Sequence, residues 1–334
     1  MSCTASATAR SAAAIGVVIV NYNGAHHLSR CLTALRSQTL PPRDIVLLDN
    51  ASSDASLQLL RSFPEVRLLP QLHNLGFARG NNLAVAAVDP ACDLIALLNA
   101  DAFVAPDWLE QLWHVAQGRP EVAAFGSLML LAADPSRIDG AGDACHCSGL
   151  VWRRDHGRLL SQMSLPAQPY EVFSPCAAAA LYRRDIFNAV GGFDEAFFCF
   201  VEDVDLGFRL RLAGFQCVQV PSARALHVGS GSTGGSHSAF ALYHGHRNLV
   251  WNYVKNMPGP LFWLFLPVHL LLNLASLLWF AGRGQGAVVL RAKRDACRDL
   301  PRVWRQRRTL QKNRRASLMS LWSALGKVPL GRQR

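Results

Sequence analysis

The sequence has no CxxC pair among its nine cysteines. That absence excludes the paired-cysteine motifs of structural zinc sites and of thioredoxin-like dithiols. The one tight group, Cys145-His146-Cys147, has a spacing that suits zinc poorly, and no second pair follows it. We therefore expect reduced thiols, as in a cytosolic protein.

A long apolar run near the N-terminus is also missing. Residues 1–13 are small and polar with Arg10 as their single charge, and the apolar run at 15–20 is shorter than the core of a signal peptide. We predict a loose tail over residues 1–13 and a strand over 15–20.

Acidic residues are nearly absent from the C-terminal part. From residue 283 to the end there are 15 Lys or Arg and two acidic residues, whereas the rest of the chain has 19 basic and 21 acidic residues. A near-neutral body with a basic tail is typical of proteins that attach to anionic lipid or to nucleic acid.

Residues 256–282 contain no Asp, Glu, Lys or Arg. The stretch is long enough to cross a bilayer, for which about 20 apolar residues are needed. Pro267, His269 and Asn273 interrupt it, so a re-entrant or interfacial helix also fits, and a buried core helix is the third interpretation. Because the basic tail follows directly, we predict contact with a membrane surface.

The first part of the chain alternates between short apolar runs and segments with helical spacing. This rhythm predicts an α/β fold with a mostly parallel sheet flanked by helices. We expect strands at 15–20, 44–48, 66–69, 94–98 and 125–131, and helices at 26–38, 57–63, 77–88 and from 106 onward. Residues 132–170 are rich in Gly, Asp, Arg and Pro and predict a loop-rich insertion. Beyond them we expect helices near 185–190 and over 202–213, and a strand at 215–220.

Polar clusters follow the predicted strands, where ligands bind in open α/β sheets. After the first strand, Tyr22 stands between Asn21 and Asn23, which suits a heterocyclic base, although an ordinary polar turn is the alternative. Asp49 and Asn50 follow the second strand. A carboxylate there can accept from a base N–H or a ribose hydroxyl, or it can cap a helix.

Asn99 and Asp101 follow the strand at 94–98. A divalent cation that bridges two phosphates prefers hard oxygen ligands such as Asp. His227 comes after the strand at 215–220. Alone it is more often a structural residue, but beside Asp101 it can supply a nitrogen ligand to the same metal.

Glu202, Asp203 and Asp205 open a predicted helix. Acids at a helix N-terminus are favoured electrostatically, and Asp205 can pair with Arg209 four residues later, which is the structural explanation. Phenylalanines at 197, 198 and 200 add an apolar wall. A carboxylate beside such a wall can have a raised pKa and act as a general base.

In this order the motifs resemble glycosyltransferase family 2, and within it the bacterial rhamnosyltransferase-like branch. The resemblance covers residues 15–255. The matching segments are 17–23, 49–54, 74–82, 98–101, 190–195 and 202–206, followed by His227 and Arg247-Asn248.

The resemblance implies a GT-A fold over residues 14–255. The apolar stretch and the charge of the tail predict a membrane-associating apolar helix and a basic tail over 256–334. The resemblance also implies that the nucleotide is held by Asn21, Tyr22, Asp49, Asn50, Asn74, Gly76, Arg79, Asn82 and Asn99. Asp101 and His227 would bind a divalent cation, Mg²⁺ or Mn²⁺, and Asp203 would deprotonate the acceptor hydroxyl. Glu202, Asp205 and Arg247 would surround the acceptor.

The activity implied is inverting transfer of a sugar, with rhamnose as the first expectation, from a dTDP- or UDP-sugar to a lipid-linked or polysaccharide acceptor. The place implied is the cytoplasmic face of a bacterial inner membrane, in cell-surface glycan synthesis. The sequence departs from the family pattern twice. Asn99 replaces the first acid of the DxD-type motif, so Asp101 must carry most of the metal binding, and the acceptor floor at 176–180 lacks glycine.

Three other interpretations fit parts of the sequence. A non-catalytic sugar-nucleotide-binding scaffold is the main alternative, but Asp101, Asp203 and His227 are all present. A nucleic-acid-binding protein should have a basic body as well as a basic tail, interleaved with more aromatic residues. A sugar nucleotidyltransferase should carry a Gly-rich phosphate loop with Lys or Arg after the first strand, where this chain has Asn-Tyr-Asn.

Overall fold

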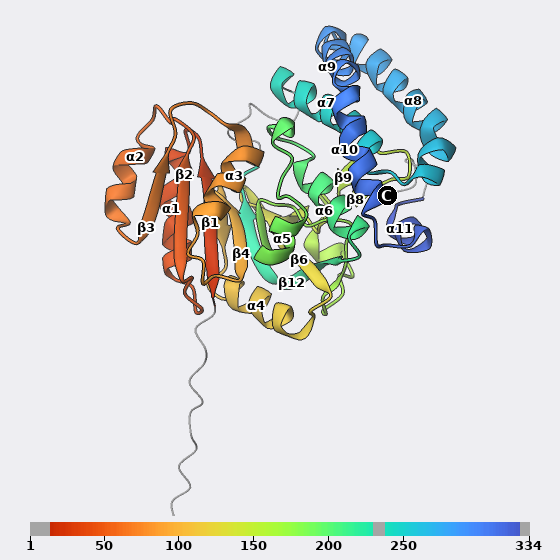
Figure 1. Cartoon of the computed structure of the whole chain (residues 1–334). Helices are drawn as coiled ribbons and strands as arrows, with labels where there is room; N and C mark the ends of the chain where they lie inside the picture. Colours follow the sequence, from red (N-terminus) through yellow and green to blue (C-terminus); the bar gives the residue numbers. More distant parts are fainter. Residues whose placement is uncertain (1–13, 230–237, 328–334) are drawn as a thin grey trace, which may run out of the picture.

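The computed structural model describes residues 14–229 and 238–327 and contains one large mixed sheet (Figure 1). Its ten strands are β1 (Ile15–Asn21), β2 (Asp44–Asp49), β3 (Val66–Pro70), β4 (Leu94–Asn99), β5 (Ala102–Val104), β6 (Val122–Leu131), β7 (Asp134–Gly140), β10 (Tyr170–Glu171), β11 (Ala179–Arg183) and β12 (Gln216–His227). Their order is β10-β12-β6-β11-β4-β1-β2-β3, with β5 paired to β12 and β7 to β6. β8 (Asp143–Cys145) and β9 (Val151–Arg153) form a separate hairpin.

The N-terminal half of the sheet is parallel, as predicted. β1 pairs with β2 and β4, and β2 pairs with β3. Along β1 the side chains alternate between two layers, since Val17 and Ile19 pack on one face and Val18 on the other. Both faces are covered, which is why these strands have nearly continuous apolar sequences.

Helices cover both faces of the sheet. α1 (Ala25–Arg36) and α4 (Trp108–Gly118) cover one face, and α3 (Gly76–Ala87), α5 (Arg184–Ala189) and α6 (Glu202–Leu212) cover the other. The helices predicted at 26–38, 77–88, 185–190 and 202–213 are confirmed to within about two residues. The helix predicted at 57–63 is one turn, α2 (Ser56–Leu59), followed by a short 3-10 turn.

The second half of the sheet is antiparallel in places that the sequence did not indicate. β11 lies between β4 and β6 and is antiparallel to both. It comes from the Ala-rich segment, whose small side chains carry no clear period of two. β12 runs to His227, well past the predicted end at 220. Its pairing with β6 has a register shift between Val220 and Arg224 that accommodates polar residues, and these polar residues concealed the rest of the strand in the sequence.

The prediction of a loop-rich insertion over 132–170 missed the strands that this segment contains. This segment holds β7, β8 and β9 and the first residue of β10. β7 has the sequence DPSRIDG and is an edge strand, because β6 is the one strand it pairs with among the described residues and its other side has only an isolated bridge from Arg137 to Leu159. Edge strands tolerate proline and charge, and their sequences therefore look like loops.

Among the described residues, five helices follow the sheet and gather at one end of the molecule (Figure 1). They are α7 (Ala239–Asn256), α8 (Gly259–Ala281), α9 (Gly286–Arg298), α10 (Leu300–Lys312) and α11 (Leu318–Ala324). α7 packs against α6 on one side and against α9 and α10 on the other. The buried cluster between them includes Phe208, Trp251, Tyr253 and Met257.

Within the described ranges, α8 is the one helix long and apolar enough to cross a membrane. Only 11% of its most apolar window is buried. Its exposed large side chains include Trp263, Leu264, Leu270, Leu271, Leu274, Leu278 and Trp279. The buried-core interpretation of this stretch was therefore wrong.

Candidate active site

A cleft of about 1080 Å³ opens where β1 and β4 end and α6 begins. Ten of the residues predicted for the site line it: Asn21, Tyr22, Asn50, Asn74, Gly76, Asn99, Asp101, Glu202, Asp203 and His227. The other five lie around it and are Asp49, Arg79, Asn82, Asp205 and Arg247. The sheet thus brings together residues that are up to 206 positions apart in the sequence.

At one end of the cleft Tyr22 is 40% exposed, with its ring free for a flat ligand. The neighbouring Asn21 is buried, and its Nδ2 donates to Asp49 Oδ1 at 2.9 Å. Asp49 also accepts from the hydroxyl of Ser52 at 2.6 Å and from its backbone N–H at 2.9 Å. The Asp49 carboxylate is therefore enclosed and orients Asn21, while Tyr22 faces the open cleft.

The loop before α3 approaches the opposite wall closely. Gly76 has a φ of +79°, and a Cβ there would lie 2.6 Å from the Phe198 ring. Asn50 joins this loop to β2, because its Nδ2 donates to Gly76 O at 3.2 Å and its Oδ1 accepts from Leu75 N at 3.2 Å. Only glycine satisfies both the backbone conformation and the space at position 76.

The middle of the cleft holds a carboxylate and an imidazole. His227 Nε2 lies 3.4 Å from Asp101 Oδ1, and its Nδ1 donates to Asp139 Oδ2 at 2.8 Å. Arg153 Nη1 donates to the same Asp139 oxygen at 2.7 Å. The histidine is held by Asp139 from behind, and its Nε2 points toward Asp101 and the cleft.

The charges of this group reinforce one another. Burial opposes the charged forms, yet hydrogen bonds to Asp101 and Asp139 outweigh it and raise the pKa of His227 to about 9. The same contacts hold the pKa of the Asp101 carboxyl below its usual range against the effect of burial. His227 is therefore protonated near neutral pH when no metal is bound, and a divalent cation ligated by its Nε2 would take the place of that proton.

The Asp101–His227 pair fits a divalent metal ion in its donor chemistry. One carboxylate and one imidazole, with the second ring nitrogen bound to a carboxylate, is a common ligand arrangement. The described residues contain no group of three or more metal-ligating side chains, so a metal would need further ligands such as diphosphate oxygens. The Cys145-His146-Cys147 group shows no metal geometry either, and the described cysteines are free thiols.

The far end of the cleft carries the acidic start of α6. Asp203 Oδ1 accepts from Val204 N at 2.8 Å, and Oδ2 accepts from Ala177 N at 3.5 Å. Burial raises the pKa of the Asp203 carboxyl, although Arg153 and these N–H groups act in the opposite direction. A carboxylate with a raised pKa that faces a cleft is suited to accept a proton.

Two more carboxyls lie near Asp203, and both are buried. Burial, together with the negative charge of Asp203, holds the pKa values of Glu202 and Asp143 well above the usual range. One oxygen of each side chain has no hydrogen-bond partner among the described residues. Burial thus favours the neutral forms of Glu202 and Asp143, whereas Asp203, which has Arg153 and two backbone N–H groups nearby, is the one of the three best suited to hold a charge.

The backbone just before α6 is strained. Phe198, Phe200 and Val201 all have φ values between 67° and 70°, which is rare for residues other than glycine. Asn248 Nδ2 holds the segment by donating to the carbonyl oxygens of residues 197, 199 and 200 at 2.8–3.0 Å. Arg247 Nη2 donates to the carbonyls of residues 196 and 197. Arg247 therefore positions the strained loop from outside the cleft.

Three other predicted residues also contact protein groups outside the cleft. Asp205 is fully buried. Its ion pair with Lys255 of α7, at 2.6 Å, joins α6 to α7, and its predicted pair with Arg209, at 2.9 Å, lies within α6. Asn82 exchanges two hydrogen bonds of 2.9 Å with the backbone of residue 193. Arg79 is exposed and lies 3.6 Å from Glu195.

Sequence reasoning missed Asp139, Asp143 and Arg153. All three belong to the segment that was interpreted as a loop. The acidic residues and arginines of that segment were the only sign in the sequence that it could contribute to a site. They line the cleft because β7 and the β8–β9 hairpin fold over its open side. The floor beneath is made by the small residues 176–178.

Comparison with known proteins identifies the family of this chain. Residues 16–191 match the family described as glycosyl transferase family 2. The chain is 33% identical over 248 residues to the N-acetylglucosaminyl-diphospho-decaprenol L-rhamnosyltransferase of Mycobacterium tuberculosis, covering 68% of this chain and 80% of the relative. It is 31% identical over 225 residues to the O-antigen biosynthesis protein RfbC of Myxococcus xanthus, covering 64% and 17%.

Two solved structures share the fold. GalNAc-T7 with UDP, GalNAc and Mn²⁺ superposes with a TM-score of 0.58 at 19% identity, covering 74% of this chain and 48% of that one. The mannosyltransferase PcManGT of Pyrobaculum calidifontis, solved with GDP-Man and Mn²⁺, gives 0.54 at 17% identity, covering 92% and 87%. These matches confirm the predicted GT-A fold, and with the matched family they show that the chain belongs to glycosyl transferase family 2.

Proposed function

We propose that this glycosyltransferase moves a sugar, with rhamnose as the first candidate, from a dTDP- or UDP-sugar to a lipid-linked acceptor with inversion at the anomeric carbon. The observation that carries the proposal is the order of groups along one cleft. The exposed Tyr22 follows β1, Asp101 follows the neighbouring strand β4 and lies beside His227, and Asp203 contacts the N–H of Ala177 just before β11, the next strand of the sheet. The relative named for rhamnosyl transfer to a diphospho-decaprenol substrate supports the choice of sugar and acceptor.

Each group has one task in this reaction. The Tyr22 ring and the amides around it hold the base and ribose, and Asp203 accepts the proton of the acceptor hydroxyl. The acceptor oxygen forms its bond to the anomeric carbon while the bond from that carbon to the diphosphate breaks, and the bonding electrons leave with the diphosphate. A divalent cation held by Asp101 and His227 would stabilise the charge on the leaving diphosphate.

The acceptor would approach over residues 176–178, beside Asp203. Burial raises the pKa of Glu202 and favours its protonated form, which can donate a hydrogen bond to an acceptor hydroxyl without competing as a base. This floor has cysteine and alanine where the family pattern has glycine. Because these side chains are small, a sugar ring can still lie close to the backbone.

We further propose that α8 lies in the membrane interface, at the cytoplasmic face, and does not span the bilayer. Its two ends both contact α7, because Tyr253 Oη donates to Phe262 O at 2.7 Å and the rings of His246 and Phe280 lie 5.1 Å apart. A spanning orientation would carry the basic helix α9, packed along α8, into hydrocarbon at a high cost. An interfacial helix with flanking cations has no such conflict.

A donor screen tests the proposed reaction. Purified full-length protein would be incubated with Mn²⁺ or Mg²⁺, a membrane extract as the source of acceptor, and each common nucleotide sugar, and release of nucleoside diphosphate would be followed. We expect release with one donor, and its loss when the metal is chelated. Binding of a nucleotide sugar without any release would contradict a transferase and favour a sugar-nucleotide-binding scaffold.

A further inference from the structure

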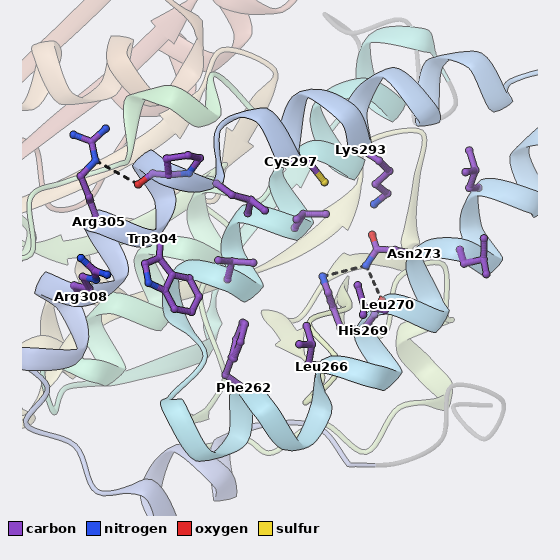
Figure 2. A pocket seen from close by; sticks show the side chains of 16 residues that line it. Phe262, Leu266, His269, Leu270, Asn273, Lys293, Cys297, Trp304, Arg305 and Arg308 are labelled. Atoms are coloured by element: carbon purple, nitrogen blue, oxygen red, sulfur yellow. Dashed lines mark hydrogen bonds between the residues drawn. The ribbon is translucent and has the colours of Figure 1, made fainter.

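A second hollow lies on the other side of α7 from the cleft. It is a groove of about 780 Å³ between α8 and the helices α7, α9 and α10 (Figure 2). Its walls are apolar along most of the length, with Phe262, Leu266 and Trp304 at one end and Leu274 and Leu277 at the other. Leu274 is 53% exposed, so the groove is open along the same side on which α8 presents its apolar residues.

The polar side chains of α8 within the groove satisfy each other. His269 Nδ1 donates to the carbonyl of Ser148 at 2.7 Å, and its Nε2 accepts from Asn273 Nδ2 at 3.1 Å. Figure 2 shows these two side chains pointing toward one another. Asn273 also donates to the His269 carbonyl at 2.7 Å. Both ring nitrogens of His269 and the amide nitrogen of Asn273 are engaged in these bonds, so few polar atoms of α8 face the apolar interior of the groove.

The charged residues of the groove are all basic. Lys293, Arg305 and Arg308 belong to its lining, and no described residue of the lining is acidic. Figure 2 shows Arg305 and Arg308 together beside Trp304, and Lys293 at the other end near Asn273. An apolar trough with cations at both ends is complementary to a hydrocarbon chain with an anionic head group.

α7 is a shared wall between the groove and the catalytic cleft. Gly245 of α7 lines the cleft, whereas Val250 and Val254 line the groove. Lys293 Nζ donates to the carbonyl of His246 at 2.9 Å, directly beside Gly245. The cation at this end of the groove is therefore attached to α7 next to a residue that lines the cleft.

We propose that this groove holds the hydrocarbon chain of the lipid-linked acceptor, with the acceptor's phosphates passing the Lys293 end on the way to Asp203. The assignment rests on the proposed function, since it names how the acceptor of that reaction is held. The chain enters from the bilayer through the side that Leu274 lines, and burial of its methylene and methyl groups drives binding.

Cys297 provides a direct readout, because it lines the groove and is the exposed cysteine of the described residues. The full-length protein would be treated with N-ethylmaleimide, and modification of the Cys297 peptide would be followed by mass spectrometry. Farnesyl diphosphate is the probe. At about ten times its Kd, the probe should slow alkylation about tenfold, as expected for a ligand that shields the thiol by mass action.

Two matched variants test where the probe lies. Leu274→Trp fills the groove and should abolish protection. Leu271→Trp, on the same helix and 65% exposed but outside the lining, should leave protection unchanged. Thermal melts of both variants would show that each is folded. Equal protection in the two variants would overturn the proposal.

Other occupants give different results. Equal protection by inorganic diphosphate would remove the role of the chain, and equal protection by phosphatidylglycerol vesicles would assign the groove to bilayer lipid. Protection that grows with protein concentration without a probe would indicate a second copy of the chain. Each of these results overturns the assignment to the acceptor. The Cys297 protection assay contains no donor sugar. A failed donor screen would therefore contradict the proposed reaction, whereas the protection assay would still show whether the groove binds a hydrocarbon chain.

Discussion

Asp203 and Glu202 are adjacent in sequence, but their surroundings give them different protonation states. Burial raises the pKa of both carboxyls, and the shift of Glu202 is increased by the charge of Asp203. Arg153 and backbone N–H groups stabilise the ionised form of Asp203. Two neighbouring carboxyls whose pKa values are pushed apart can serve as a base and a neutral hydrogen-bond donor.

We predict that Asp203→Asn lowers kcat by about 10²- to 10⁴-fold, because an amide cannot accept the acceptor proton. The Kd of the donor, measured by calorimetry, should not change. Glu202→Gln is the control, since glutamine resembles the protonated acid and should retain most activity. An inactive Glu202→Gln together with an active Asp203→Asn would reverse the two assignments.

The pH dependence of the reaction should follow the pKa of Asp203. A base is active only when deprotonated, so a raised pKa places the acid limb of kcat/KM above the range of an ordinary aspartate. Arg153→Gln removes a charge that lowers this pKa, and should therefore move the limb to higher pH. Arg154→Gln changes the neighbouring arginine, which stacks on Tyr170, and should leave the limb in place. No shift in Arg153→Gln would mean that another group sets the limb.

Asp139 is expected to act on the metal through His227. Its Oδ2 accepts from His227 Nδ1 at 2.8 Å and thereby fixes the ring with Nε2 toward Asp101. Loss of such a partner typically weakens metal binding by about 10- to 100-fold, and we predict this for Asp139→Asn in Mn²⁺ titrations followed by electron paramagnetic resonance. Asp134→Asn lies on the same strand and contacts Arg137 at the surface, so its Mn²⁺ affinity should not change. Equal affinities would show that Asp139 has only a structural role.

At the scale of elements, the strained segment before α6 depends on close contact with α3. Gly76→Ala would place a methyl against the Phe198 ring and force a left-handed backbone on alanine. We predict a loss of about 1–3 kcal/mol in the free energy of unfolding, measured in urea, together with a higher KM for the donor. Gly118→Ala is the control, because no atom lies within 4 Å of its added carbon and its φ is not positive, so stability should be kept or increased. An unchanged urea midpoint for Gly76→Ala would show that the Phe198 loop adapts freely.

How far the sequence predicts these elements depends on their burial. β1, β2 and β4 are covered on both faces, so their apolar runs identified them and placed Asn21 and Asp101 at the correct edge. β7 lies at an edge and is polar, which concealed the strand and with it Asp139. The role of Arg247 was also out of reach, because its contacts are with backbone carbonyls of a strained loop, and sequence spacing carries no information about those.

At the scale of the whole molecule, apolar and basic surfaces occur together in the C-terminal helices. α8 exposes Trp263, Leu264 and Leu271, and the helices after it carry an excess of Lys and Arg. Deleting this region is a poor test of membrane binding. Arg307 of α10 donates to the carbonyl of Val254 at 2.8 Å, and the cluster around Trp251 would lose its cover.

Substitutions at the exposed face test membrane binding without removing that cover. We predict that the double variant Leu264→Glu and Leu271→Glu loses flotation with phosphatidylglycerol vesicles. Both leucines are 65% exposed, so the fold should be retained. Each buried leucine contributes about 1.5–3 kcal/mol, and the loss of two should weaken binding by roughly 100-fold or more.

Leu72→Glu is the control for this variant, because Leu72 is 98% exposed in the loop after β3, away from the C-terminal helices, and its replacement should leave flotation unchanged. Salt should weaken the binding of the unaltered protein, since the basic helices contribute a charge attraction that ions screen. The double variant would then bind weakly at every salt concentration. If it floats as well as the unaltered protein, charge alone holds the protein at the bilayer, and α8 does not enter the interface.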